Sequence, residues 1–294
     1  PLLLCYKVIV QVRFTFNAML WIEMFVYSFP LLIVGLGGIV NETFGRPMLK
    51  AWLPGSETYR NEQVGIYSAC YKLSLLITLF VQAFKMGAEP FFFKQAEGQN
   101  PQKVYARVMK FFVIVLAVMF LAVSLFLPVW SRMIGPEYRA GINVVPILLL
   151  ANMFLGIYYN LTIWFKLSDR TVAGTYITLI GTAITLSINY FLIPRFGYVA
   201  SAWGTFSCYG SMMVICYLWG QKKYPIPYAT KKLVAYIVIV VLLFFMHKGI
   251  TYFVVGAIFS LGLGVVLLAA FSWFILQVEK KEFQKLPVIG KYIH

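Results

Sequence analysis

Residues that could carry acid–base or nucleophilic chemistry are scarce in this sequence. The 294 residues include two histidines, His247 and His294, and one aspartate, Asp169. On the membrane topology that hydropathy predicts, Asp169 and His247 lie on opposite sides, so they cannot belong to one catalytic triad. No helix contains a histidine pair and no strand precedes a glycine-rich loop, which argues against haem, a metal site and a nucleotide-driven pump. We therefore expect no enzyme, no cofactor and no metal, but a protein that moves a substrate.

Charged side chains within apolar segments are the remaining candidates, because a charge in hydrocarbon is costly and usually faces a cavity or a partner. Asn41, Glu42 and Arg46 lie in the outer third of the first predicted helix. Glu42 and Arg46 are four residues apart and can pair on one helix face. They form either a cavity-lining pair that binds a polar head group or relays a proton, or an interfacial pair that ends the helix. The second reading follows from Pro47, which disfavours helical geometry at Arg46.

Lys72 lies within the second predicted helix, nine residues from Gln63. At about 1.5 Å per residue, this corresponds to a depth of about 14 Å, near the middle of a membrane. Snorkelling would relieve only part of the cost. The cation could face a central cavity and attract a phosphate-bearing substrate, or it could form a structural ion pair with Glu42 or Glu62.

The opposite end of the same helix carries Lys85 and Glu89, again four residues apart, with Gly87 and Pro90 favouring a bend. These two residues form either an ion-paired inner gate or a surface pair that contributes little to stability. Asn160, within a later predicted helix, either lines a cavity or makes an interhelical hydrogen bond.

Composition places these residues in a membrane protein. Hydrophobic residues make up 61% of the chain and charged residues 12%, with a mean hydropathy of +0.80. Soluble domains contain about 25% charged residues, so a soluble enzyme is excluded. Apolar runs long enough to cross about 30 Å of hydrocarbon predict an all-α polytopic membrane protein with about eight transmembrane helices. After an apolar stub at 1–10, the runs are 27–46, 64–88, 108–131, 142–165, 172–193, 198–220, 232–247 and 251–277.

The formal charge of +15 is distributed unevenly between the two predicted sides. If the segment after 277 is cytoplasmic and the sides alternate, 17 basic residues lie inside and seven outside, with Lys72 alone within a helix. The positive-inside rule therefore predicts a cytoplasmic C-terminus, and the basic excess requires no nucleic acid. The lysines at 222–223 and 231–232 either bind anionic lipid head groups or only set this topology.

The four cysteines are Cys5, Cys70, Cys208 and Cys216. All four lie in apolar runs, and none belongs to a CxxC pair. This pattern predicts buried free thiols rather than a disulfide framework or a metal site.

Short motifs occur in a characteristic order along essentially the whole chain. They are PLLIVG at 30–35, NETFGR at 41–46, LP at 53–54, VGIY at 64–67, KL at 72–73, AFKMGAEPFFF at 83–93, LGIYYN at 155–160, WFK at 164–166, IPRFGY at 193–198 and YPIPY at 224–228. In order and spacing the chain resembles the second half of bacterial polysaccharide flippases. These are lipid-linked oligosaccharide exporters of the multidrug/oligosaccharidyl-lipid/polysaccharide superfamily, and the resemblance is closest to versions from Bacteroides-like bacteria.

The resemblance implies a fourteen-helix fold, with two six-helix lobes and two trailing helices around a central cavity. Residues 1–26 would then be the end of a preceding helix and a cytoplasmic linker, and 27–220 the second lobe. Residues 221–294 would form a basic loop, two trailing transmembrane helices and a cytoplasmic tail. Because the chain begins at Pro1 inside an apolar run, we expect that a first lobe is missing and that the fragment alone does not transport.

The implied function is flipping of undecaprenyl-diphosphate-linked oligosaccharide repeats from the cytoplasmic to the periplasmic leaflet of the bacterial inner membrane. It would serve capsule, O-antigen or exopolysaccharide assembly, in contact with membrane lipids and in functional association with a polysaccharide polymerase. In such a protein Glu42 would couple to a proton or sodium gradient, and Lys85 and Glu89 would form the inner gate. The expected cavity residues are Lys72, Arg46, Asn41 and Asn160.

Three other functions stay open. A multidrug or cation antiporter shares the superfamily fold but would favour acidic groups in its cavity. A lipid II flippase has the same architecture and would be essential for growth. A membrane-embedded polysaccharide polymerase or glycosyltransferase, from a different class, would need large loops or a carboxylate-rich catalytic loop, and the predicted loops are short.

Overall fold

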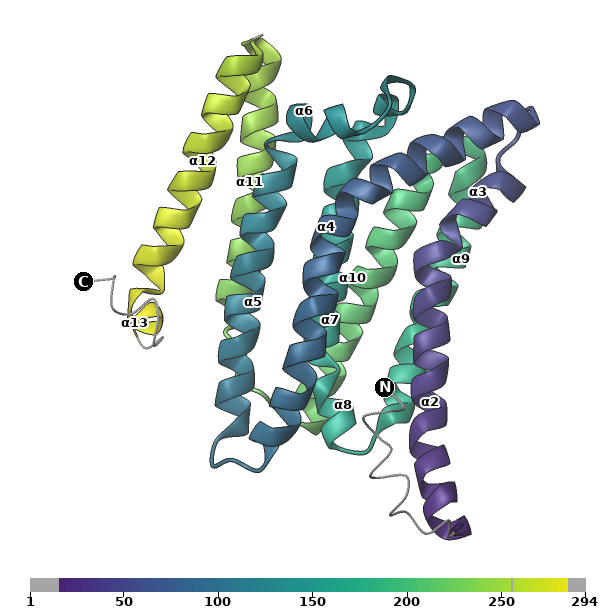
Figure 1. Ribbon diagram of the computed structural model, residues 1–294, viewed down its shortest axis with the longest axis vertical. Helices are drawn as coiled ribbons and strands as arrows, with labels where there is room; N and C mark the ends of the chain where they lie inside the picture. Colours follow the sequence, from purple (N-terminus) through teal and green to yellow (C-terminus); the bar gives the residue numbers. More distant parts are fainter. Residues whose placement is uncertain (1–15, 255, 285–294) are drawn as a thin grey trace, which may run out of the picture.

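The computed structural model describes residues 16–254 and 256–284, and all regular structure within these ranges is helical (Figure 1). Eight helical segments are long and apolar enough to cross a membrane. They are α2 (Ala18–Thr43), α4 (Glu57–Ala96), α5 (Pro101–Ser124), the continuous η2, α7 and α8 (Pro136–Leu167), α9 (Thr171–Phe196), α10 (Tyr198–Lys223), α11 (Thr230–Phe253) and α12 (Ala257–Val278). The chain is an all-α polytopic membrane protein, as its hydropathy predicts.

The helices run back and forth between two ends of the bundle (Figure 1). The "η2 end" contains α3 (Gly45–Trp52), α6 (Leu127–Trp130), η1 (Ser131–Met133) and η2 (Pro136–Val144). The "α4–α5 end" contains the α4–α5 and α10–α11 connections, α8 (Ile163–Leu167) and α13 (Lys280–Phe283). The three described connections that are predicted to be cytoplasmic all lie at the α4–α5 end. The structure thus agrees with the alternation of sides, and the cytoplasmic assignment of that end stays a prediction.

Two helices begin earlier than hydropathy predicts, because a polar residue caps each of them. The Asn17 side chain accepts hydrogen bonds from the backbone N–H groups of Met19 and Leu20, at 3.1 and 3.2 Å, so α2 begins at Ala18 rather than 27. Residues 18–26, expected to be linker, are therefore helical. Ser56 caps α4 in the same way, by accepting from the N–H of Tyr59. The predicted apolar stub at 1–10 lies outside the described residues.

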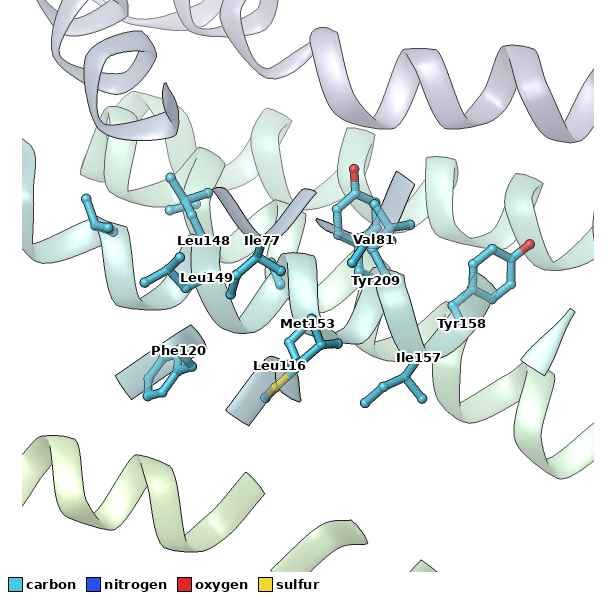
Figure 2. Close-up of a cluster of buried hydrophobic side chains, with 14 of the residues drawn as sticks. Ile77, Val81, Leu116, Phe120, Leu148, Leu149, Met153, Ile157, Tyr158 and Tyr209 are labelled. Atoms are coloured by element: carbon cyan, nitrogen blue, oxygen red, sulfur yellow. The ribbon is translucent and has the colours of Figure 1, made fainter. Parts of the chain in front are cut away.

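Helix α7 (Val145–Leu161) forms the centre of the bundle, with 13 of its 17 residues buried. Figure 2 shows apolar side chains from three neighbouring helices gathered around it, among them Ile77 of α4, Phe120 of α5 and Tyr209 of α10. Gly156 permits a close approach of α4 to α7, since a Cβ there would lie 2.7 Å from a methyl carbon of Val81. Small residues of this kind are typical of tightly packed membrane helices.

The cysteines are buried within this packing. Cys70, Cys208 and Cys216 are free and buried, which confirms the prediction for these three residues. Cys5 lies outside the described residues.

One carboxylate attaches the last two spanning helices to the rest of the bundle. Glu279 follows α12, and its side chain is 2% exposed. It accepts hydrogen bonds from Lys110 Nζ of α5 at 2.7 Å, and from Lys232 Nζ and Tyr236 Oη of α11 at 2.9 and 2.7 Å. Burial raises the pKa of the Glu279 carboxyl, but these three donors outweigh that effect and hold the pKa below its ordinary value of 4.5.

We predict that Glu279→Gln destabilises the protein by about 2 kcal/mol, because it leaves two lysines facing an uncharged amide. Thermal unfolding of the purified protein in detergent measures this. Since the folded pKa is lowered, the stabilisation by Glu279 is fully present above pH 4.5 and is lost as the pH falls through the lower folded value. The variant should therefore lose less stability than the wild type between pH 5 and the acid limit of the assay.

Glu282→Gln provides a matched control, because Glu282 is 26% exposed and lies 3.8 Å from the same Lys110 ammonium. An equal destabilisation by both substitutions would contradict the central role of Glu279.

Candidate functional site

A cavity of about 390 Å³ lies between α2, α4, α7 and α8. Unlike the core around α7, it is lined by charged and polar side chains together with apolar ones. Three residues that the sequence singles out, Glu42, Lys85 and Glu89, meet there. The other polar and aromatic residues at its surface are Gln82, Tyr158, Tyr159, Thr162 and Lys166.

Helical periodicity explains why these side chains share the cavity. On α4, Gln82, Lys85 and Glu89 are spaced three and four residues apart, so they project from one face of the helix. On α2, Gly35, Gly38 and Glu42 follow the same spacing. A Cβ at either glycine would meet nothing within 4 Å, so the missing side chains leave open space beside Glu42.

Glu89 makes an ion pair across helices. Its Oε1 lies 2.5 Å from Nζ of Lys166 on α8, and the two side chains are 36% and 16% exposed. The ammonium of Lys85 instead lies 4.5 Å from the centre of the Tyr159 ring, a cation–π contact. The expected Lys85–Glu89 pair is therefore wrong. Lys166 reaches Glu89 from a helix 77 residues away in sequence, which local spacing does not reveal.

Glu42 and Arg46 also do not form the expected pair. Phe44 interrupts the helix between them, so Glu42 belongs to α2 and Arg46 to α3. Pro47 does not remove Arg46 from a helix, because it lies in the first turn of α3, where its missing N–H costs no hydrogen bond. The Arg46 guanidinium lies 5.0 Å from the centre of the Tyr71 ring. Within the described part of the chain, Glu42 makes no hydrogen bond or ion pair, and its side chain is half-buried.

The two predicted asparagines are both buried, but they lie at different distances from the cavity. Asn160 of α7 lines a small void together with Lys85, Glu89 and Lys166, and its Nδ2 has no hydrogen-bond partner in the described structure. Asn41 does not line the cavity. Its Nδ2 faces the Met212 sulfur at 4.0 Å.

Lys72 lies in a separate recess on another side of α4. Thirteen residues at 3.6 per turn place Lys72 about 220° around the helix from Lys85. The recess contains residues of α6, η1 and η2, so Lys72 lies toward the η2 end. Its depth in a membrane stays a prediction. The expected partners Glu42 and Glu62 do not pair with it.

Comparisons with protein-family models, curated proteins and solved structures find no match to this chain.

The cavity is suited to binding and exchanging charge. Lys85, which contacts the Tyr159 ring and makes no ion pair within the described residues, can bind an anion, and the neighbouring Asn160 amide can donate to that anion. Glu42 can bind a proton or a cation. Within the described ranges there is no group of three His, Cys, Asp or Glu residues that could hold a metal ion. The sequence alone did not single out Lys166 as a site residue. Its position at a helix end, within the Trp-Phe-Lys motif, could have identified it as a candidate.

We predict that a double-mutant cycle between Glu89→Gln and Lys166→Gln shows a coupling of about 1 kcal/mol in thermal or chemical unfolding, because the pair is partly exposed. The cycle between Glu89→Gln and Lys85→Gln should give a coupling near zero. A larger coupling for the second cycle would show that Glu89 pairs with Lys85 at i, i+4. It would contradict the assignment of Lys166 as the partner.

Proposed function

We propose that this chain forms part of a transporter that flips undecaprenyl-diphosphate-linked oligosaccharide repeats across the bacterial inner membrane, from the cytoplasmic to the periplasmic leaflet. The observation that carries the proposal is the polar cavity among spanning helices, with a lysine and a glutamate, Lys85 and Glu42, that form no ion pair within the described residues. A charged side chain among membrane-spanning helices carries a high free-energy cost, so its presence there indicates a pathway for a polar or charged substrate. The ordered motifs that resemble polysaccharide flippases supply the substrate class.

In this proposal, Lys85 attracts the diphosphate of the carrier lipid, and Asn160 donates a hydrogen bond to the same group. Glu42 takes up a proton or sodium ion and so couples transport to an ion gradient. The Glu89–Lys166 pair holds α4 against α8 and acts as the inner gate. An anionic cargo that approaches Lys166 can replace Glu89 as the partner of this ammonium, and so can open the pair.

One observation favours a multidrug or cation antiporter as the second candidate. Glu42 is a carboxylate without an ion pair in the part of the chain that the structure describes, and Tyr158 and Tyr159 line the same cavity. A carboxylate with aromatic neighbours can bind an organic cation. The Lys85 ammonium in this cavity would repel such a cargo, so the flippase is the better-supported function.

Deletion of the gene that carries this sequence tests the proposal in its host. We expect complete lipid-linked repeats to accumulate on the cytoplasmic face while surface polysaccharide disappears. Lipid extraction with mass spectrometry and surface-polysaccharide staining measure both. Unchanged polysaccharide with increased sensitivity to cationic drugs would support the antiporter. Loss of viability with cell-wall defects would indicate a lipid II flippase, and accumulation of repeats on the periplasmic face a polymerase.

Point variants restored to the deletion strain locate the site. We predict that Lys85→Gln and Glu42→Gln each lower polysaccharide export at least tenfold, which corresponds to about 1.4 kcal/mol of lost interaction with the cargo or the coupling ion. Export is measured as surface polysaccharide per unit of protein in the membrane.

Lys50→Gln is the matched control, because Lys50 is 56% exposed in a surface pair with Glu57. Wild-type export by both cavity variants would show that the cavity is not the transport site.

A further inference from the structure

A second recess, of about 520 Å³, lies on the other side of α4 near the η2 end. It is separate from the cavity that Glu42 and Lys85 line. Its wall combines one cation with a hydroxyl and two large aromatic side chains. The residues that matter for its chemistry are Ser68, Ala69 and Lys72 of α4, Trp130 of α6, Met133 of η1 and Tyr138 of η2.

Lys72 is the charge of this recess. Its side chain is exposed, and no carboxylate of the described ranges lies within 4.0 Å of its ammonium. The recess lies at the η2 end of the bundle, beside α6, η1 and η2, and lipid head groups lie toward the ends of spanning helices. Trp130 and Tyr138 have the aromatic and polar character typical of this interfacial layer.

Several contacts fix the walls of the recess. A Cβ on Gly65 would lie 2.9 Å from Cε1 of Tyr138, so the tyrosine ring rests directly against the α4 backbone. The Trp130 indole donates to the carbonyl of Ala122 at 3.1 Å. Arg139 Nε donates to the carbonyls of Ser131 and Ile134, at 3.0 and 3.3 Å, and closes the η1 turn. The recess is therefore formed before any ligand arrives, which lowers the entropic cost of binding.

We propose that this recess binds the phosphate head group of a membrane amphiphile. Lys72 binds the phosphate as a cation, the Ser68 hydroxyl donates to it, and Trp130 and Tyr138 flank the adjoining glycerol or sugar. The acyl or polyprenyl chain remains in the surrounding leaflet. The site does not depend on the flippase proposal, because a phospholipid and a carrier lipid offer the same phosphate chemistry.

A cysteine reporter in the recess tests the site directly. Ala69→Cys lines the recess, and an uncharged maleimide labels it in nanodiscs of phosphatidylcholine, with the chain without this substitution as the background. We expect phosphatidylglycerol or a polyprenyl diphosphate, each added at the same mole fraction, to slow labelling about fivefold, the effect of one basic residue on an anionic lipid.

Lys72→Gln should abolish this protection. Lys248→Gln should retain it, because Lys248 is an exposed lysine at the same end that contacts Asn143.

The two lipids distinguish the sources of the head group. Protection by phosphatidylglycerol identifies the bulk leaflet as the source. Protection by the polyprenyl diphosphate alone identifies the carrier lipid and gives the recess a place in its transport. Labelling that neither lipid slows, or protection that persists in Lys72→Gln, would overturn the site. Equal thermal unfolding of the Lys72 and Lys248 variants shows that the comparison is made on folded protein.

Discussion

The ion pair between Glu89 and Lys166 determines the chemistry of the cavity. Two lysines lie near this carboxylate, and at 2.5 Å it pairs with the one on α8. Had it paired with Lys85 on its own helix, Lys166 rather than Lys85 would be the available cation of the cavity. A cross-helix pair also joins α4 to α8, which an i, i+4 pair on the surface of one helix cannot do. One choice of partner therefore both holds two helices together and leaves Lys85 able to bind an anion.

Glu279 shows the opposite use of a carboxylate. Three donors converge on its two oxygens, and the side chain is almost completely buried. Nothing is left on this group to exchange with a ligand, so its role is to fix α11 and α12 on α5. Glu42 is half-buried and makes no ion pair within the described ranges. The number of partners, rather than burial alone, separates the carboxylate that holds the fold from the one that can bind a proton or a cation.

The eight spanning helices could be predicted from the sequence because each requires only a long apolar run, which is a local property. The helix ends at Asn17 and Ser56 were predictable in principle from their capping side chains, although hydropathy alone placed them several residues too late. The pairing of Glu89 with Lys166, and the absence of an ion pair at Glu42 within the described residues, were not predictable in this way. They depend on which helices pack together, and on the interruption at Phe44, and no spacing within one helix contains that information.

The placement of Lys72 follows from the geometry of α4 alone. A regular helix turns by 100° per residue, so two lysines thirteen residues apart must face different sides and different levels. A ligand bound at Lys85 in the cavity would have to pass around α4 to reach Lys72 in its recess. The recess is therefore reached more directly from the surrounding leaflet than from the cavity. Under the two proposals, the lysines thus serve separate ligand populations: one enters between the spanning helices, and the other resides in the lipid at the η2 end.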